Sequence, residues 1–199
     1  MASTIEVANR ALTKLGAARI TALSDDNKQA RAINSCYDVL LDAELRTNRW
    51  TFAIRRVELP ADADAPLFGF AYSYTLPSDF LRLDLINDMY PDVSLDSYVG
   101  SDPADYQVEN NKILTIYSAP LKVRYGARVT DPQQWDALFI EAFACRLAAE
   151  ICEDLTQSTP KRQLAWNEYQ RALSMAKRAN AIERPPQQGP DDAWIFARL

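Results

Sequence analysis

The chain has 199 residues, and its 22 lysines and arginines stand against 27 aspartates and glutamates, a formal net charge of −5. Hydrophobic residues make up 48% and charged residues 25%, which is typical of one globular domain, with or without an appended lobe. The sequence has no histidine and only five glycines. This excludes histidine-based triads and histidine metal sites, and no phosphate-binding glycine loop can be read in the chain.

Residues 1–50 predict the N-terminal helical pair of a bundle. Ser3 or Thr4 can cap a first helix whose apolar residues recur every three or four positions, and Gly16 is placed to end it. After a polar turn, a second helix is expected over about 27–47, with its apolar residues on one side.

Residues 51–128 predict a β-rich insertion, because the apolar period changes from 3.6 to 2. The pair Asn110-Asn111 tolerates left-handed backbone and therefore favours a hairpin between the strands on either side of it. Strands are expected over 72–76, 81–85, 106–109, 112–117 and 121–127.

Residues 129–183 predict two long helices that complete the bundle. Asp131-Pro132 supplies an N-cap and a proline for the first, expected to run to about Leu155, and Thr159-Pro160 starts the second, expected to run to about Ile182. The first of these is apolar on more than one side, which places it at the centre of the bundle. The residues predicted for the core are Leu12, Leu15, Tyr37, Leu41, Trp50, Phe52, Trp135, Phe139, Phe143 and Ile151.

Residues 184–199 predict an extended C-terminal docking tail. The prolines and glycine of residues 185–190 oppose regular structure, yet large apolar side chains follow them. Those side chains either fold back on their own bundle or dock on a neighbouring molecule. The residues predicted as assembly contacts are Trp194, Ile195, Phe196 and Arg198. The fold expected for the whole chain is α+β, mainly α: a discontinuous helical bundle with a β-rich insertion and an extended tail.

Catalytic and metal-binding chemistry has no convincing pattern in the sequence. Aspartates are frequent between residues 62 and 105, but their spacing does not match a calcium loop and favours a solvated acidic surface. Cys36, Cys145 and Cys152 form no CxxC pair, and with no histidine to activate them they are expected to be packing residues. We therefore expect no catalytic residue, no metal and no cofactor, and a protein that is not an enzyme.

Residues distributed over most of the chain form a pattern that resembles one known family. They include Asn9, Leu15-Gly16, Tyr37-Asp38, Trp50-x-Phe52-Ala53, the segment 74–83, Leu155-Thr156, Tyr169, Asn180-Ala181 and a tryptophan-containing C-terminus with Arg198 near its end. In this pattern the chain resembles the tail tubular protein A family, the head-to-tail adaptors of short-tailed bacteriophages.

The resemblance implies a structural virion protein at the junction of head and tail, made in the host cytoplasm. Such adaptors form a homo-oligomeric ring, expected to contain twelve copies, that binds the portal protein on one side and the tail nozzle protein on the other. Tail fibres can attach near this ring. DNA passes through its channel during genome ejection without sequence-specific binding, and no membrane is involved. An acidic balance suits such a channel, because a negative wall repels phosphates.

Two alternatives from other classes remain open at this stage. The chain could be a monomeric helical interaction or scaffold domain, which predicts no ring and a tail folded on its own core. It could also be a head-completion connector of a long-tailed phage, which predicts rings with a different partner on the tail side.

Overall fold

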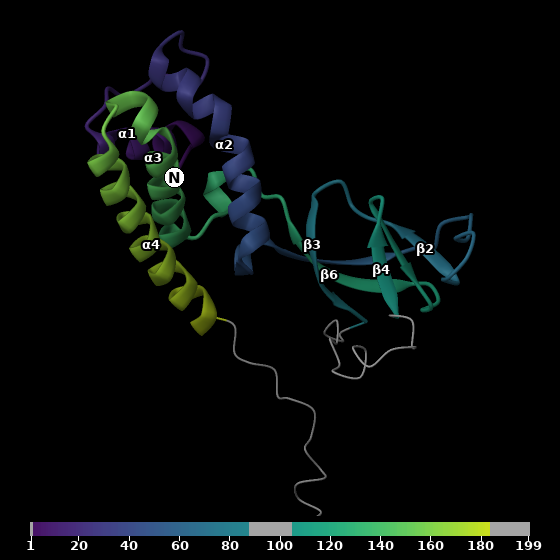
Figure 1. Ribbon diagram of the computed structural model, residues 1–199. Helices are drawn as coiled ribbons and strands as arrows, with labels where there is room; N and C mark the ends of the chain where they lie inside the picture. Colours follow the sequence, from purple (N-terminus) through teal and green to yellow (C-terminus); the bar gives the residue numbers. More distant parts are fainter. Residues whose placement is uncertain (1, 88–104, 184–199) are drawn as a thin grey trace, which may run out of the picture.

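The computed structural model describes residues 2–87 and 105–183, and within them the protein is α+β and mainly α, as the sequence predicts. A helical bundle lies on one side and a β lobe projects from it (Figure 1). The helices are α1 (Thr4–Leu15), α2 (Lys28–Thr47), α3 (Ala137–Thr156) and α4 (Thr159–Ile182). The strands are β1 (Ile54–Leu59), β2 (Tyr72–Thr75), β3 (Phe80–Ile86), β4 (Tyr106–Glu109), β5 (Lys112–Thr115) and β6 (Leu121–Ala127).

Local capping sets the ends of the first two helices. Ser3 and Glu6 form a reciprocal capping box at the start of α1, and Gly16 ends that helix with a φ of 70°. Asn27 caps α2 by accepting a hydrogen bond from the backbone N–H of Ala30 at 2.7 Å. These ends agree with the boundaries expected from the sequence.

The start of α3 differs from the expectation. Asp131 and Pro132 begin only a 3₁₀ turn, Pro132–Gln134, and α3 itself starts at Ala137. The cause is Trp135, whose backbone is extended at ψ 148° while its indole donates to the carbonyl of Val129 at 2.8 Å. Asp136 then caps α3 by accepting from two backbone N–H groups. The prediction that this helix starts at Asp131 is therefore wrong.

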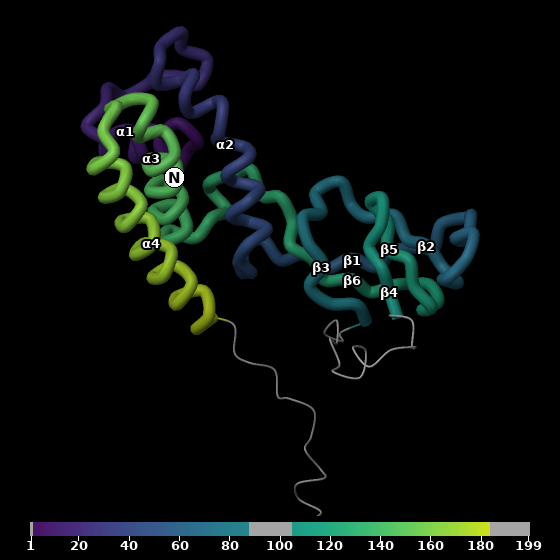
Figure 2. The backbone as a smooth tube through the Cα atoms, viewed as in Figure 1, coloured from purple at the N-terminus to yellow at the C-terminus, as the bar shows by residue number. Residues whose placement is uncertain are grey.

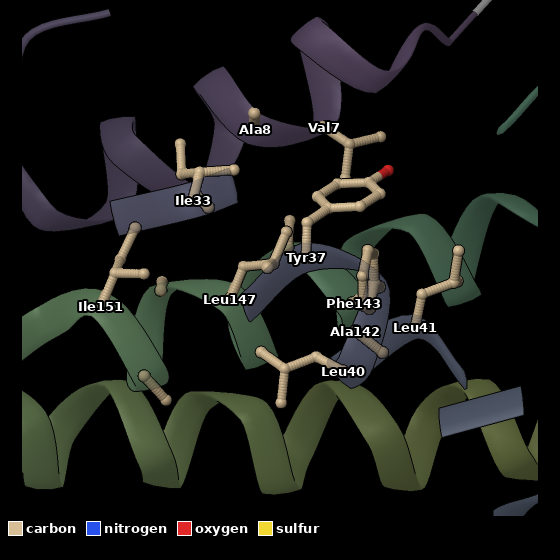
Figure 3. Packing of buried hydrophobic residues seen from close by; sticks show 14 of the residues in the cluster. Val7, Ala8, Ile33, Tyr37, Leu40, Leu41, Ala142, Phe143, Leu147 and Ile151 are labelled. Atoms are coloured by element: carbon tan, nitrogen blue, oxygen red, sulfur yellow. The ribbon is translucent and has the colours of Figure 1, made fainter. Parts of the chain in front are cut away.

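The core of the bundle lies among α1, α2 and α3. Tyr37 of α2 packs between Val7 of α1 and Phe143 of α3 (Figure 3), and the Tyr37 and Phe143 rings meet edge to face at 5.2 Å. Burial raises the pKa of Tyr37 to about 12. The helices form a single apolar cluster, and α3 is its central element, in contact with each of the other three.

An aromatic group closes the end of this core near the β lobe. The Phe139 ring lies 4.9 Å from Trp50, 5.0 Å from Phe52 and 5.2 Å from Trp135, measured between centroids. Offset and edge-to-face packing of this kind adds to the stabilisation that burial already supplies. Phe139 therefore links the linker after α2 to the start of α3.

The β lobe contains two antiparallel sheets of three strands each. One has the order β1-β6-β3 and lies next to the bundle, and the other has the order β2-β5-β4 and lies beyond it (Figure 2). The β4–β5 hairpin turns at Asn110 and Asn111, both with positive φ, which confirms the predicted hairpin. Tyr74, Ile113 and Leu121 are fully buried in a second, smaller apolar cluster that joins the two sheets.

Candidate assembly surfaces

The predicted assembly contacts Trp194, Ile195, Phe196 and Arg198 lie outside the described residues. Of the ten residues predicted for the core, nine are buried in the bundle cluster, and Phe52 is half-buried against it. Two other surfaces, both within the described residues, have features that fit an assembly protein.

Helix α4 carries two parallel series of residues, each spaced alternately by four and three positions. The first series is the face that packs on the bundle, and its members Ala165, Tyr169 and Ala176 are buried. The second series lies next to it and is exposed along its whole length, and we call it the outer stripe. The outer stripe consists of Leu164, Glu168, Arg171, Met175, Arg178 and Ile182.

Three large apolar side chains of the outer stripe face solvent. Leu164 is 61% exposed, Met175 63% and Ile182 77%. Single exposed apolar side chains are ordinary on a protein surface, but a set aligned along one helix is typical of an interaction site. The outer stripe is therefore the first candidate assembly surface.

Polar contacts on the inner side hold α4 in place. The Tyr169 hydroxyl donates to Glu44 of α2 at 2.5 Å, and both side chains are buried. Burial and this hydrogen bond to a carboxylate raise the pKa of Tyr169. Arg146 of α3 lies over the rings of Trp166 and Tyr169, 5.0 and 5.5 Å from their centroids. These contacts fix the rotation of α4 and thus the direction in which the outer stripe faces.

The second candidate surface is the loop between β1 and β2, at the end of the β lobe farthest from the bundle (Figure 1). In this loop Leu67 is 98% exposed and Phe68 86% exposed. Asp64 is exposed nearby. We call residues 63–69 the lobe tip.

Asp62 anchors the base of the lobe tip. Its carboxylate accepts hydrogen bonds from Ser73 at 2.6 Å and Thr75 at 2.9 Å, and it forms an ion pair with Lys112 at 2.8 Å. The hydrogen bond from Lys112, with those from the two hydroxyls, lowers the pKa of Asp62 to about 2. The tip therefore extends from a fixed base, not from a free strand end.

A buried ion pair connects the lobe to the bundle. Asp84 of β3 has no exposed surface, and its carboxylate accepts a hydrogen bond from Nε of Arg82 at 3.0 Å. Arg49, in the linker that follows α2, lies 3.4 Å from the same oxygen. Arg82 also donates to backbone carbonyls at the end of α2, those of Leu45, Arg46 and Asn48. These carbonyls have no partner within the helix, so a guanidinium suits them.

Two further contacts tie the same region together. Asn180 of α4 accepts from the backbone N–H of Thr51 at 2.8 Å and donates to the carbonyl of Arg49 at 2.7 Å. Arg128, just after β6, forms ion pairs with Asp42 at 2.5 Å and Asp38 at 3.0 Å. Charged and hydrogen-bonded contacts thus tie the bundle to the lobe, beside apolar ones such as the packing of Leu81 of β3 against the bundle cluster.

Most of the aspartates and cysteines considered as metal-binding or catalytic residues make hydrogen bonds or lie in the packed interior, where the structure describes them. Asp79 and Asp105 accept hydrogen bonds from the hydroxyls of Tyr125 and Tyr117. Within residues 2–87 and 105–183, no three Cys, Asp or Glu side chains gather where they could hold a metal ion. Cys145 and Cys152 are buried and Cys36 is half-buried, and all three are free thiols. Burial raises the pKa of Cys36 to about 11. Four of the aspartates considered for a metal site, at 88, 92, 96 and 102, lie outside the described residues.

In the described part of the chain, no helix combines the length and the apolar character needed to span a membrane. A scan against models of protein families finds none that matches the chain, and a search of curated proteins finds no relative.

None of the residues predicted as assembly contacts lies on either candidate surface, although the loop of residues 61–69, which holds the lobe tip, is one where the sequence leads us to expect a partner-specific surface. The outer stripe has a readable signal, since Leu164, Met175 and Ile182 lie 11 and 7 residues apart, on one side of a helix. The lobe tip has none beyond two adjacent apolar residues in a loop, which in many proteins fold inward.

Proposed function

We propose that the chain is a head-to-tail adaptor: a structural protein whose copies form a ring between the portal and the tail nozzle of a short-tailed bacteriophage and leave a channel for DNA. The proposal starts from the residues that resemble the tail tubular protein A family. Its other expectations follow from that resemblance: about twelve copies, a place at the head–tail junction of the virion, no catalytic role and no cofactor.

The protein has two different apolar surfaces that lie far apart in space, and this observation is the main structural support for the proposal. The outer stripe lies on α4, at the outside of the bundle, and the lobe tip lies at the far end of the β lobe (Figure 1). A protein with two different apolar surfaces can join its copies head to tail. Such contacts close into a ring when the rotation from one copy to the next permits. A domain that binds a single partner needs only one such surface.

Charge distribution adds a constraint on how the ring would be built. Helix α4 contains five basic residues, Lys161, Arg162, Arg171, Lys177 and Arg178, and one acidic residue, Glu168. The chain as a whole is acidic. The acidic balance of the sequence leads us to expect a channel wall that repels DNA. The basic helix α4 would then face away from the channel and toward neighbouring copies.

Sedimentation through a density gradient tests the proposal. The purified protein is run alone and after mixing with the portal ring of the same virion. We expect the portal to sediment faster with the protein bound, at about twelve copies per ring. A version that ends at residue 184 then tests whether the predicted tail contacts are needed. If the protein stays at the top of the gradient at every concentration even when the portal ring is present, the result contradicts the proposal and favours a domain that binds a single partner.

A further inference from the structure

We infer that the lobe tip of one copy docks on the outer stripe of α4 in the next copy. This inference rests on the proposed function, since it names the contact that would join neighbouring subunits of the ring. It commits to a second copy of this chain as the occupant of the outer stripe.

The two surfaces both carry large exposed apolar side chains, and the spacing of these side chains is compatible with direct contact. Leu67 and Phe68 are adjacent and almost fully exposed, and they project from the end of the lobe. On the outer stripe, Met175 and Ile182 are seven residues apart, about 10 Å along the helix axis. Two large side chains of one loop can therefore cover the space between two exposed apolar residues of the stripe and remove all four from water.

The charges of the two surfaces are opposite. Arg171 and Arg178 lie between the apolar residues of the outer stripe, and Asp64 lies three residues before Leu67. Within residues 2–87 and 105–183, none of these three side chains has an ion pair or a side-chain hydrogen bond. Each is thus free to pair across an interface, and charge complementarity of this kind sets the orientation of partners.

The geometry of the chain favours this pairing over the pairing of like surfaces. Two outer stripes could pack antiparallel, with Glu168 opposite Arg178, but that contact has twofold symmetry and closes at two copies. It would also leave Leu67 and Phe68 in water. Docking of the tip on the stripe uses both apolar surfaces of every copy and continues from one copy to the next.

Cysteine cross-linking within the assembled ring tests the inference. In a Cys36→Ala background, which removes the half-buried thiol, Phe68→Cys and Met175→Cys are placed in the same chain. The variant is assembled on the portal ring and treated with a short bis-maleimide. We expect a ladder of covalent multimers on a denaturing gel. The matched control pairs Phe68→Cys with Val39→Cys, an exposed position on α2, and should give no ladder.

Charge reversal gives a second readout that does not depend on the reach of a cross-linker. Asp64→Arg should raise the protein concentration needed for half-saturation of the portal by about tenfold, because it places like charges across the contact. Adding Arg178→Asp should restore most of the loss. Lys177→Asp, a change on α4 outside the stripe, should have little effect.

The outcomes separate this inference from the proposed function. A ring that forms without a ladder, and whose assembly is insensitive to the charge changes, overturns the inference and leaves the adaptor function standing. Covalent dimers from Met175→Cys alone overturn it in favour of α4 pairing with α4. Failure of the unaltered protein to join the portal overturns both. A ladder together with restoration by Arg178→Asp supports the tip-to-stripe contact.

Discussion

The helical bundle and the β lobe are stabilised by different kinds of contact. In the bundle, one large apolar cluster runs through all four helices and ends in the rings around Phe139. In the lobe, a smaller apolar cluster is supplemented by polar contacts at Asp62, and the joint to the bundle rests on Asp84 and its arginines.

The two kinds of contact have different consequences: the apolar core makes the bundle rigid, and the polar joint sets the orientation of the lobe. A continuous apolar core makes the bundle a stiff body, since close packing leaves little room for rearrangement. The joint, in contrast, is specified by directional bonds from Arg82 to the last carbonyls of α2 and to Asp84. Such bonds set the angle at which the lobe leaves the bundle and so decide where the lobe tip points. Apolar truncation should therefore damage the bundle, and removal of charge should damage the joint.

The largest expected effect is the truncation of Phe139 in the bundle. Phe139→Ala removes a buried ring that contacts four other aromatic rings, and it should lower the free energy of unfolding by about 3–5 kcal/mol. Urea denaturation followed by circular dichroism measures it. Phe68→Ala is the matched control: its ring is exposed, so the change should stay within about 0.5 kcal/mol. Equal losses from both variants would contradict the placement of the two rings.

A smaller loss is expected at the joint. Asp84→Asn removes the charge that pairs with Arg82 and Arg49, and it should lower stability by about 1.5–3 kcal/mol. Amide hydrogen exchange in β3 and β6 should rise more than exchange in α1, because the lobe loosens while the bundle core stays intact. If exchange rises equally in both regions, the joint is not a separate element of the structure.

The exposed counterpart of that joint should matter less. Arg128→Gln breaks the ion pairs with Asp42 and Asp38, whose side chains are partly or largely exposed, and should cost no more than about 1 kcal/mol. High salt should reduce the difference between this variant and the unaltered protein, since salt screens exposed pairs. A loss of stability as large as that of Asp84→Asn would show that the exposed ion pairs of Arg128 contribute as much as the buried pair at Asp84.

The smallest effect is a dependence on pH at the base of the lobe tip. The pKa of Asp62 is lowered from 3.8 to about 2, so its contacts stabilise the folded state fully only above about pH 4. As pH falls from 4 to 2, the unfolded chain takes up a proton before the folded one does, and this contribution is lost. Asp62→Asn should flatten that part of the stability curve, as measured by urea denaturation at several pH values. An unchanged slope would show that Asp62 is not held by Lys112 and its hydroxyl partners.

Local signals in the sequence were sufficient to predict the helices and the hairpin. Ser3, Gly16 and Asn27 act within a few residues of their own position, so the ends of α1 and α2 can be read directly. The same holds for Asn110 and Asn111, whose left-handed backbone makes the turn between β4 and β5. Asp131-Pro132 shows the limit of local reading: the signal is real, but the indole of Trp135 ends the turn it starts.

Features that depend on distant residues could not be read from the sequence. Leu59 pairs with Leu121 across 62 positions, and no local pattern separates this register from others or divides the strands into two sheets. Similarly, Asp84 looked like one of many acidic residues until β3 placed it against Arg82 and Arg49. Both candidate surfaces belong to this class, since exposure is decided by what the rest of the chain leaves uncovered.

Electron cryomicroscopy of the protein mixed with the portal ring would show whether this chain forms the proposed ring. We expect a collar of added density with the symmetry of the ring, in which the β lobe of each copy reaches α4 of the next. Portal rings without a collar, at protein concentrations well above those of the portal, would contradict it.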